Sequence, residues 1–478
     1  MTEGTEAGDG DGGSAERDRA ELAKLGYAQQ LLREMGGFHN FALSFSIISV
    51  LTGAITLYGH GLTHGGPLVM TIGWPLVALG TMTVALARAE LASAYPTAGA
   101  LYHWSAILGG NGWGFATAWL NTLGQFAITA GIDYGLALFV VDTLGLEPSR
   151  LQILGVYGAI LTSHAILNHV GVRAVAVLNW LSAWYHIIGV ALLVVALLWR
   201  APMASPGFLM RRYSADGEHT YWYAFAIGLL QAQWTFTGYD ASAHTTEETR
   251  DPSRNAPWGI VLSVAVSAVV GWIMLLVITL AIQDLPATAA AGNPFIQVLT
   301  TGLGETLGRW MVWMVMVAMW FCGLSSVTSN SRMLFAFARD GGLPASKLLA
   351  RVSPRFQSPH VAVWVSAVAA FAVALWARAY AAMVALSTLA LYASYALPVL
   401  AALRDGKLVR RGPWQLGRWT VAVRVLAVAW VAIVTVLFVL PPNQLAGYTF
   451  AGSVLAIALY WFAWMKPRFQ GPPRLPPL

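Results

Sequence analysis

The stretch FSIISVLTGAIT, residues 45–56, sets serine, threonine and glycine in the middle of an apolar segment. It lies within residues 35–87, a run that contains no aspartate, glutamate, lysine or arginine. About twenty apolar residues in a helix cross the hydrocarbon core of a bilayer, so this run is long enough for two crossings. Glycine weakens a helix, and serine and threonine hydroxyls can satisfy backbone groups that a break releases. The stretch therefore predicts a membrane helix that is broken near its centre.

A second apolar segment has a similar interruption, TFTGYD at residues 235–240. Counting the apolar segments between charged and glycine- or proline-rich stretches makes the two interrupted segments the first and sixth of about twelve membrane helices. They occupy matching positions in two five-helix halves, which indicates an inverted-repeat transporter that holds its solute at the breaks. Ordinary packing of small residues is the alternative. The predicted helices cover residues 38–61, 66–88, 112–141, 151–169, 172–199, 221–248, 258–282, 309–336, 360–377, 379–403, 421–440 and 446–464.

The composition excludes a soluble globular protein. Of the 478 residues, 57% are hydrophobic and only 10% are charged, whereas about 25% are charged in an ordinary soluble domain. In lipid, only helices and closed β-barrels satisfy every backbone group, and the alternating segments of about ten residues that build a barrel do not occur here. We therefore expect an all-α integral membrane protein. Its net charge of +6 describes topology rather than a nucleic-acid partner.

The positive charges predict the orientation of the chain. With twelve crossings, all but six of the 28 lysine and arginine residues would lie on the face that carries both termini. Cytoplasmic loops are enriched in these residues, so we expect cytoplasmic termini in the plasma membrane. Residues 1–34, which begin with a Gly-, Asp- and Glu-rich stretch, are predicted to be a disordered tail. The six exceptions are Arg150, Arg200, Arg211, Arg212, Arg309 and Arg378.

Three longer motifs point to a family. They are AELASAYPTAGALYHW at residues 89–104, TFTGYDASAHTTEET at residues 235–249, and residues 325–340, which end in SRMLFAFARD. In this order they resemble the amino acid–polyamine–organocation transporters, and within them the amino acid/choline branch that includes 4-aminobutyrate permeases. The resemblance implies a leucine-transporter-like fold with alternating access and no cofactor. It divides the chain into a first repeat at 36–200, an inverted second repeat at 201–404, two peripheral helices at 405–466 and a cytoplasmic tail at 467–478.

The expected function is secondary active transport of an amino acid or related amine, such as 4-aminobutyrate. Choline and polyamines are alternative solutes, and a channel is a more distant alternative. An intramembrane metalloenzyme is the rival from another class, because His60 and His64 have the spacing of metal ligands on a helix. Glycines and Pro67 surround them, so we expect a loop there, and no third ligand completes a site. We expect no enzyme activity.

The solute is predicted to lie at the two breaks. Free N–H groups at a half-helix N-terminus can hold a carboxylate, and the aromatic residues of the second break can close over the solute and meet an ammonium group. Pure packing is the alternative for these aromatics. Asn121, Gln125, Thr129 and Asp133 form a polar stripe on the third helix. Asp133 or Asp240 can pair with the amine, or cap broken backbone. The predicted binding residues are Ser49, Val50, Leu51, Thr52, Gly53, Gln125, Phe236, Thr237, Gly238, Tyr239 and Asp240.

Coupling and gating residues are predicted partly from the resemblance. Some family members have a lysine on the fifth helix in place of a sodium ion, and their pattern, counted from Gly171, ends here on His186. Histidine titrates near neutral pH, so we expect proton coupling through His186, with a hydrogen-bonded core histidine as the alternative. Sodium bound by hydroxyls of the eighth helix is the other possibility. Those hydroxyls belong to Ser325, Ser326, Thr328 and Ser329.

Acidic residues at predicted cytoplasmic helix ends suggest an inner gate. Glu90 lies close in sequence to Arg88, and the pair Glu247–Glu248 lies close to Arg250 and Arg254. We expect these charges to form a gate network together with Asp133. Solvated ion pairs that contribute little are the alternative.

Overall fold

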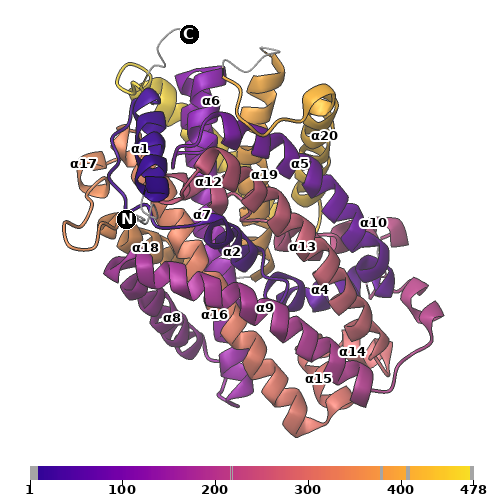
Figure 1. Cartoon of the computed structure of the whole chain (residues 1–478). Coiled ribbons are helices and arrows are strands. Elements are labelled where there is room, and N and C mark those ends of the chain that lie inside the picture. Colours follow the sequence, from indigo (N-terminus) through magenta and orange to yellow (C-terminus); the bar gives the residue numbers. More distant parts are fainter. Residues whose placement is uncertain (1–8, 216, 218, 377–379, 405–409, 474–478) are drawn as a thin grey trace, which may run out of the picture.

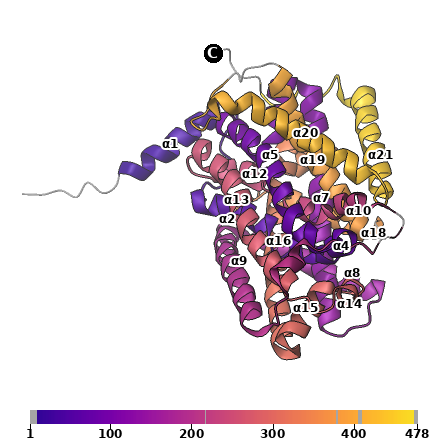
Figure 2. The same cartoon turned by 90° about the vertical axis from the view of Figure 1, so that its right-hand side faces the viewer.

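The computed structural model describes residues 9–215, 217, 219–376, 380–404 and 410–473. These residues form a bundle of helices without a β-strand, and an isolated parallel bridge joins Met35 to Thr249. Figures 1 and 2 show long helices packed side by side, with short helices at both ends of the bundle. The expectation of an all-helical membrane protein is confirmed.

The first half of the chain begins with an interrupted helix and continues with four long ones. The interrupted helix consists of α2, α3 and α4, and η1 runs directly into α5. The short α6 connects α5 to α7. The bounds are α2 Gly37–Ile48, α3 Gly53–Thr56, α4 Tyr58–Gly65, η1 Val69–Gly73, α5 Trp74–Ala94, α6 Leu101–Gly109, α7 Asn111–Thr143, α8 Arg150–Val170 and α9 Val172–Arg200.

The second half repeats this order, beginning with the interrupted helix α10, α11 and α12. The short helices α14 and α15 connect α13 to α16, and α20 and α21 end the bundle. The bounds are η2 Pro206–Met210, α10 Tyr221–Gly228, α11 Leu230–Thr235, α12 Ala241–His244, η3 Thr246–Glu248, α13 Pro252–Leu280, α14 Leu285–Ala289, α15 Pro294–Leu303, α16 Glu305–Arg339, α17 Ser346–Leu349, α18 His360–Trp376, α19 Tyr380–Arg404, η4 Gly417–Trp419, α20 Thr420–Val439, α21 Gln444–Tyr460 and η5 Trp461–Met465.

Ten helices in the described part of the chain are long and apolar enough to cross a membrane. Two of the predicted crossings are absent from this set. The sixth is divided into the short helices α10, α11 and α12, and the ninth is α18, which has only 17 residues. Both segments are apolar and lie where the sequence predicts a crossing. A total of twelve stays a prediction.

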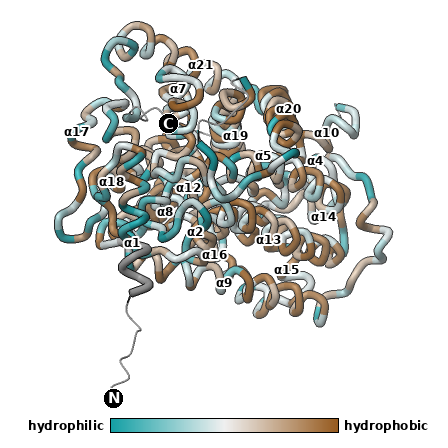
Figure 3. The backbone as a smooth tube through the Cα atoms, turned by 45° about the horizontal axis from the view of Figure 1, so that its top comes forward, coloured by the Kyte–Doolittle hydropathy of each residue, from teal (hydrophilic) through white to brown (hydrophobic). Residues whose placement is uncertain are grey.

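Burial separates central helices from peripheral ones. In the first span, 83% of the most apolar window is buried within the protein, whereas the value is 28% for α20 and 6% for α21. Figure 3 shows hydrophobic residues along the long helices and hydrophilic residues in the connecting segments and near α1. The last two helices therefore present most of their apolar surface outward, as expected for peripheral helices facing lipid.

The N-terminal region differs from its prediction. Asp9–Lys24 forms helix α1, part of which projects from the bundle in Figure 2. Leu22, Leu25 and Tyr27 are buried in the main core. The disordered tail expected for residues 1–34 is therefore wrong for this packed part, and residues 1–8 lie outside the described residues. The prediction failed because it used the Gly-, Asp- and Glu-rich composition of the segment as a whole, whereas a few apolar residues near its end pack against the bundle.

Candidate functional site

The first break releases backbone N–H groups in the centre of the bundle. Helix α2 ends at Ile48, and Ser49 adopts a left-handed φ of 29°. The Ser49 carbonyl accepts hydrogen bonds from the amides of Thr52, at 2.7 Å, and Gly53, at 2.9 Å. The amides of Val50 and Leu51 donate to no acceptor within the described ranges. Two oriented donors are thus available just before α3.

The second break has a similar construction. Helix α11 ends at Thr235 and α12 begins at Ala241. Gly238 adopts a φ of 84°, and a β-carbon there would lie 2.1 Å from Ile47 Cγ2. The Phe236 carbonyl accepts from the Tyr392 hydroxyl at 2.6 Å, and the Tyr239 carbonyl accepts from the Ser44 hydroxyl at 3.0 Å. Side chains therefore satisfy part of the released backbone.

The two breaks lie against each other. A β-carbon on Gly53 would lie 2.8 Å from Cα of Thr235, so only glycine permits this approach. Phe236 packs against Trp74 with ring centroids 4.7 Å apart, and Tyr239 packs against Tyr395 at 5.1 Å. The residues of both breaks are buried. The interruptions predicted in the first and sixth helices are therefore present, adjacent and buried.

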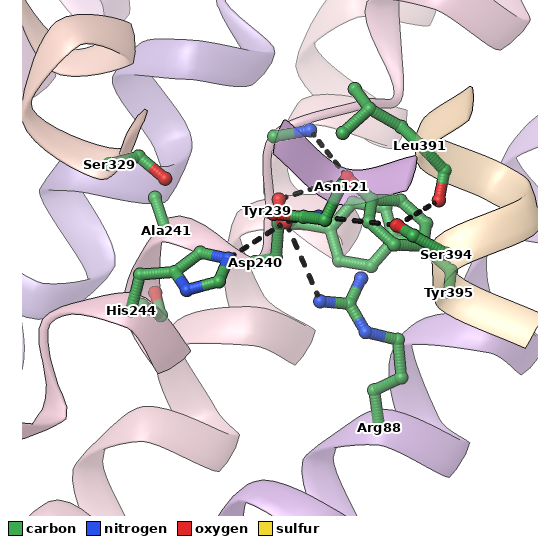
Figure 4. Close-up of polar contacts among 12 residues, drawn as sticks. Arg88, Asn121, Tyr239, Asp240, Ala241, His244, Ser329, Leu391, Ser394 and Tyr395 are labelled. Carbon is green, nitrogen blue, oxygen red and sulfur yellow. Dashed lines mark hydrogen bonds and ion pairs between the residues drawn. The ribbon is translucent and has the colours of Figure 1, made fainter. Parts of the chain in front are cut away.

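Asp240 is the centre of a buried polar cluster beside the second break (Figure 4). Its Oδ2 lies 3.2 Å from Asn121 Nδ2, 3.4 Å from Gln125 Nε2 and 3.2 Å from His244 Nε2. Its Oδ1 accepts a hydrogen bond from the Tyr395 hydroxyl at 2.9 Å. Although Asp240 precedes α12, its side chain makes no capping hydrogen bond. The alternative that Asp240 caps broken backbone is therefore wrong.

His186 lies at the first break. This residue of α9 is fully buried, and its Nε2 lies 2.6 Å from the Ser49 hydroxyl, which in turn lies 2.6 Å from the Thr52 hydroxyl. The other ring nitrogen, Nδ1, lies 2.8 Å from the Ser182 carbonyl oxygen. On α16, the Cys322 thiol donates to the carbonyl of Ile47. The residue selected by spacing from Gly171 thus contacts the backbone bend that creates the break.

Comparison with known proteins identifies the family. The sequence profile of a family described as amino acid permease matches residues 37–463. The chain belongs to this family. The permease is 38% identical to the amino-acid permease BAT1 homolog of Oryza sativa subsp. japonica over 96% of each chain. It is also 38% identical to amino-acid permease BAT1 of Arabidopsis thaliana, over 95% of this chain and 96% of the relative.

A more distant relative carries a name that includes a solute. The GABA-specific permease of Saccharomyces cerevisiae is 27% identical, over 96% of this chain and 87% of the relative. Together with the family match, these relatives establish the permease as a transporter and not an enzyme. The metalloenzyme alternative is therefore set aside.

Asp133 of the permease pairs with a histidine of α8 rather than with a residue of either break. Its Oδ2 lies 3.1 Å from Nδ1 of His164 on α8, and both side chains are fully buried. A β-carbon on Gly323 would lie 1.9 Å from the other carboxylate oxygen, so α16 approaches the pair closely. His164 was not among the predicted site residues, because it pairs between two helices and leaves no local sequence signal.

The rest of the polar stripe on α7 faces α16. Gln125 Nε2 donates to the Ser329 hydroxyl at 3.3 Å, and the hydroxyls of Thr129 and Ser326 lie 2.7 Å apart. The hydroxyls proposed as alternative sodium ligands are therefore engaged with other side chains. Ser325 donates to Asn179, and Thr328 donates to Asn168.

The predicted gate residues are buried and paired, but with other partners than expected. Glu248 pairs with Arg332 at 3.0 Å, Glu247 with Arg339 at 2.9 Å, and Glu90 with Arg424 at 2.8 Å. Residues two apart on a helix point in different directions, so Glu90 cannot pair with Arg88. The alternative of solvated ion pairs is wrong, because all three carboxylates are buried.

Two further observations revise the predictions. His60 and His64 lie on helix α4 rather than in a loop, with ring centroids 4.2 Å apart. The described residues contain no group of three or more His, Cys, Asp or Glu side chains that could hold a metal ion. At the second break, His244 was missed, although its position one turn after Asp240 was a readable signal. Tyr395 was missed because it comes from α19.

Proposed function

We propose that the permease carries an amino acid or a related amine such as 4-aminobutyrate, held between the two breaks and released by alternating access. The observation that carries the proposal is the pair of free amides at Val50 and Leu51 in a fully buried position. Backbone N–H groups at a broken helix are oriented donors, and in low dielectric they bind a carboxylate strongly. Ser49, Thr52 and Gly53 complete this part of the site.

The ammonium group of the solute is assigned to the second break. Asp240 supplies a negative charge there, whereas the ring of Tyr239 already faces the guanidinium of Arg88. Phe236, Thr237 and Gly238 line the same segment, and Gln125 connects it to α7. A solute that carries both a carboxylate and an ammonium group satisfies both breaks, whereas choline and polyamines leave the amides of Val50 and Leu51 without an acceptor.

Proton coupling is assigned to His186. Its Nε2 and the Ser49 hydroxyl share one hydrogen bond, so protonation of the ring obliges the imidazole to donate and the hydroxyl to accept. That change reorients the link between Ser49 and Thr52 at the bend of the first break. Sodium bound near Ser325 and Ser326 is the competing mechanism. Asp133, Glu90 and Glu248 are assigned to gating, with both termini in the cytoplasm and the protein in the plasma membrane.

The test is counterflow in proteoliposomes. Proteoliposomes that contain the purified permease are loaded with unlabelled alanine, 4-aminobutyrate, choline or putrescine. Uptake of the same solute in labelled form is then followed in sodium-free buffer, with and without an inward proton gradient. We expect saturable counterflow of alanine or 4-aminobutyrate and accumulation that follows the proton gradient. Counterflow of choline or putrescine alone would overturn the solute class, and a strict requirement for sodium would overturn the coupling.

A further inference from the structure

Arg88 is a buried cation beside the second break. It belongs to α5 and is fully inaccessible to solvent. Its guanidinium carbon lies 3.9 Å from the ring centroid of Tyr395 and 4.8 Å from that of Tyr239. Figure 4 shows the guanidinium pointing toward Asp240, and the closest nitrogen and oxygen of this pair are 4.0 Å apart.

The hydrogen bonds of Arg88 are unlike those of the other buried arginines. None of its three guanidinium nitrogens makes a hydrogen bond of good geometry in the described part of the chain, although the Tyr239 hydroxyl lies nearby. By contrast, Arg332 donates to Glu248, Arg339 makes two hydrogen bonds to Glu247, and Arg424 donates to Glu90. Burying a charged group without hydrogen bonds is costly, so such a group usually has an acceptor in its functional state.

Asp240 does not serve as that acceptor. Its Oδ1 already accepts from Tyr395, and its Oδ2 lies within hydrogen-bonding distance of Asn121 and His244. The 4.0 Å separation from Arg88 is also too long for a hydrogen bond. The two side chains balance each other's charge, but the donors of Arg88 remain free. A carboxylate of a bound solute would supply the acceptor that these donors lack.

The geometry of the guanidinium defines the ligand group. Its planar fork of N–H donors matches a carboxylate, which accepts two parallel hydrogen bonds. A cationic group such as choline or a polyamine amine is repelled at this position. A group with more negative charge is disfavoured because Asp240 lies next to the guanidinium.

The position of Arg88 separates its ligand group from the group held at the first break. Arg88 contacts Tyr239 and faces Asp240 at the α12 end of the second break, whereas the free amides belong to Val50 and Leu51. The two breaks meet through Gly53 and Thr235. The two candidate carboxylate anchors therefore lie at adjacent breaks, with the Asp240 carboxylate beside the second anchor.

We propose that Arg88 binds the side-chain carboxylate of an acidic amino acid, glutamate or aspartate, whose α-carboxylate is held by the first break. The inference rests on the proposed function, because it uses the same site. It names the substrate class within that function. Neutral amino acids use only the first anchor and bind more weakly.

The first experiment uses the unmodified permease and a matched pair of ligands. Unlabelled glutamate and glutamine, which differ only in the charge of the side-chain group, compete with labelled alanine in proteoliposome counterflow. We expect glutamate to inhibit at a concentration about tenfold or more below that of glutamine, because a charge-assisted bidentate contact is lost in glutamine. Equal inhibition by the two ligands, or weaker inhibition by glutamate, overturns the inference.

The second experiment changes the arginine. Arg88→Gln is expected to reduce the ratio of glutamate to glutamine affinity to about one, and Arg88→Lys is expected to give an intermediate ratio, because a single ammonium group replaces the fork. The ratio of the two affinities is the readout, because general damage to the protein weakens the binding of both ligands equally and leaves their ratio unchanged. Arg309→Met, which removes an exposed arginine paired with Glu305, is the control and should retain the ratio of the unmodified permease.

The outcomes separate this inference from the proposed function. If the unmodified permease exchanges no amino acid, the proposed function fails. If it exchanges alanine but does not bind glutamate, or if Arg88→Gln retains the preference for glutamate, the proposed function stands and the role of Arg88 is wrong. If Arg88→Gln does not fold, the ligand pair on the unmodified permease decides.

Discussion

Different interactions hold the helices together at the two ends of the paired breaks. The region formed by α12, η3 and the C-terminal part of α16 is called the α12 side. The region formed by α3, α4, α10 and α11 is called the α11 side. On the α12 side, Glu248 and Glu247 form buried ion pairs with Arg332 and Arg339. On the α11 side, none of the ion pairs between described residues joins α3 or α4 to α10 or α11.

The α11 side depends on close approach and neutral hydrogen bonds instead. A β-carbon on Gly65 would lie 3.1 Å from Cα of Phe225. Gln231 donates to the carbonyl of Ala54 at 3.1 Å, and the ring of His60 contacts the carbonyl of Ile227. Packing of this kind loses its stabilisation when the surfaces separate, because apolar groups become exposed.

The difference predicts how each side would open under alternating access. Separated charges on the α12 side regain hydration when water enters, which offsets much of the lost attraction. Opening of the α11 side has no such compensation. We therefore expect the charge of single residues to control the α12 side and side-chain volume to control the α11 side. Four predictions test this comparison, from the largest expected effect to the smallest.

Gly53→Val should abolish counterflow. The added side chain begins 2.8 Å from Cα of Thr235, so the two breaks can no longer meet. Such overpacking costs about 1–3 kcal/mol and displaces backbone at the binding site. Counterflow of the preferred solute is measured, with size-exclusion chromatography as a check of folding. Gly452→Val, on α21 where a β-carbon meets nothing within 4 Å, is the control. Normal transport by Gly53→Val would contradict volume control.

Glu248→Ala should destabilise the protein strongly. Removal of one partner leaves Arg332 charged and buried, at a cost of about 3–5 kcal/mol. The double variant Glu248→Ala and Arg332→Met should recover most of the loss, because no unpaired charge remains. Thermal unfolding in detergent measures both. If the single and double variants unfold at the same temperature, charge does not control the α12 side.

His186→Ala should separate exchange from accumulation. The residue lies at the first break between the two sides, and its loss removes the titratable group without adding volume. We expect counterflow to continue and accumulation driven by a proton gradient to disappear, because the proposed proton-carrying side chain is gone. His186→Gln, which retains a hydrogen bond to Ser49, serves as the matched variant. Persistent proton-driven accumulation in both variants would assign coupling elsewhere.

Arg173→Ala should have the smallest effect, because this ion pair is exposed. Hydrogen bonds from Arg173 lower the pKa of Glu34 below its ordinary value of 4.5. The pair therefore stabilises the fold above the unfolded pKa, and its contribution is lost as the pH falls through the lower folded pKa. Solvent screening keeps that contribution small. Unfolding curves at pH 7 and pH 4 should nearly coincide for the variant and the parent protein. A large loss at pH 7 would show that burial is not what distinguishes the α12 side.

Sequence predicted the features that have local signals. Gly53 and Gly238 interrupt apolar segments, and both breaks lie where these glycines indicate. His186 was found by counting the pattern of the resembling family from Gly171, and it lies at the first break. These features depend on short segments of sequence, and they do not depend on which distant segments pack against them.

Sequence failed where contacts join distant segments. Glu90 pairs with Arg424, 334 residues away, rather than with its neighbour Arg88. The pairing of Asp133 with His164 depends on how α7 packs against α8. The N-terminal region was predicted from average composition, which hides the few leucines that anchor it. Which side chains pair between helices depends on how the helices pack. That packing cannot be inferred from a single sequence without the fold.

The N-terminal segment also has a consequence for the synthesis of the protein. Arg33 donates to the carbonyl groups of Thr246 and Thr249, which lie 213 and 216 residues further along the chain. A ribosome adds about 5–20 residues per second, so these partners are made roughly 10–40 seconds after Arg33. During that interval the segment lacks these two hydrogen-bond acceptors. Its attachment is therefore a late step of biogenesis, completed only after the second broken helix has been inserted.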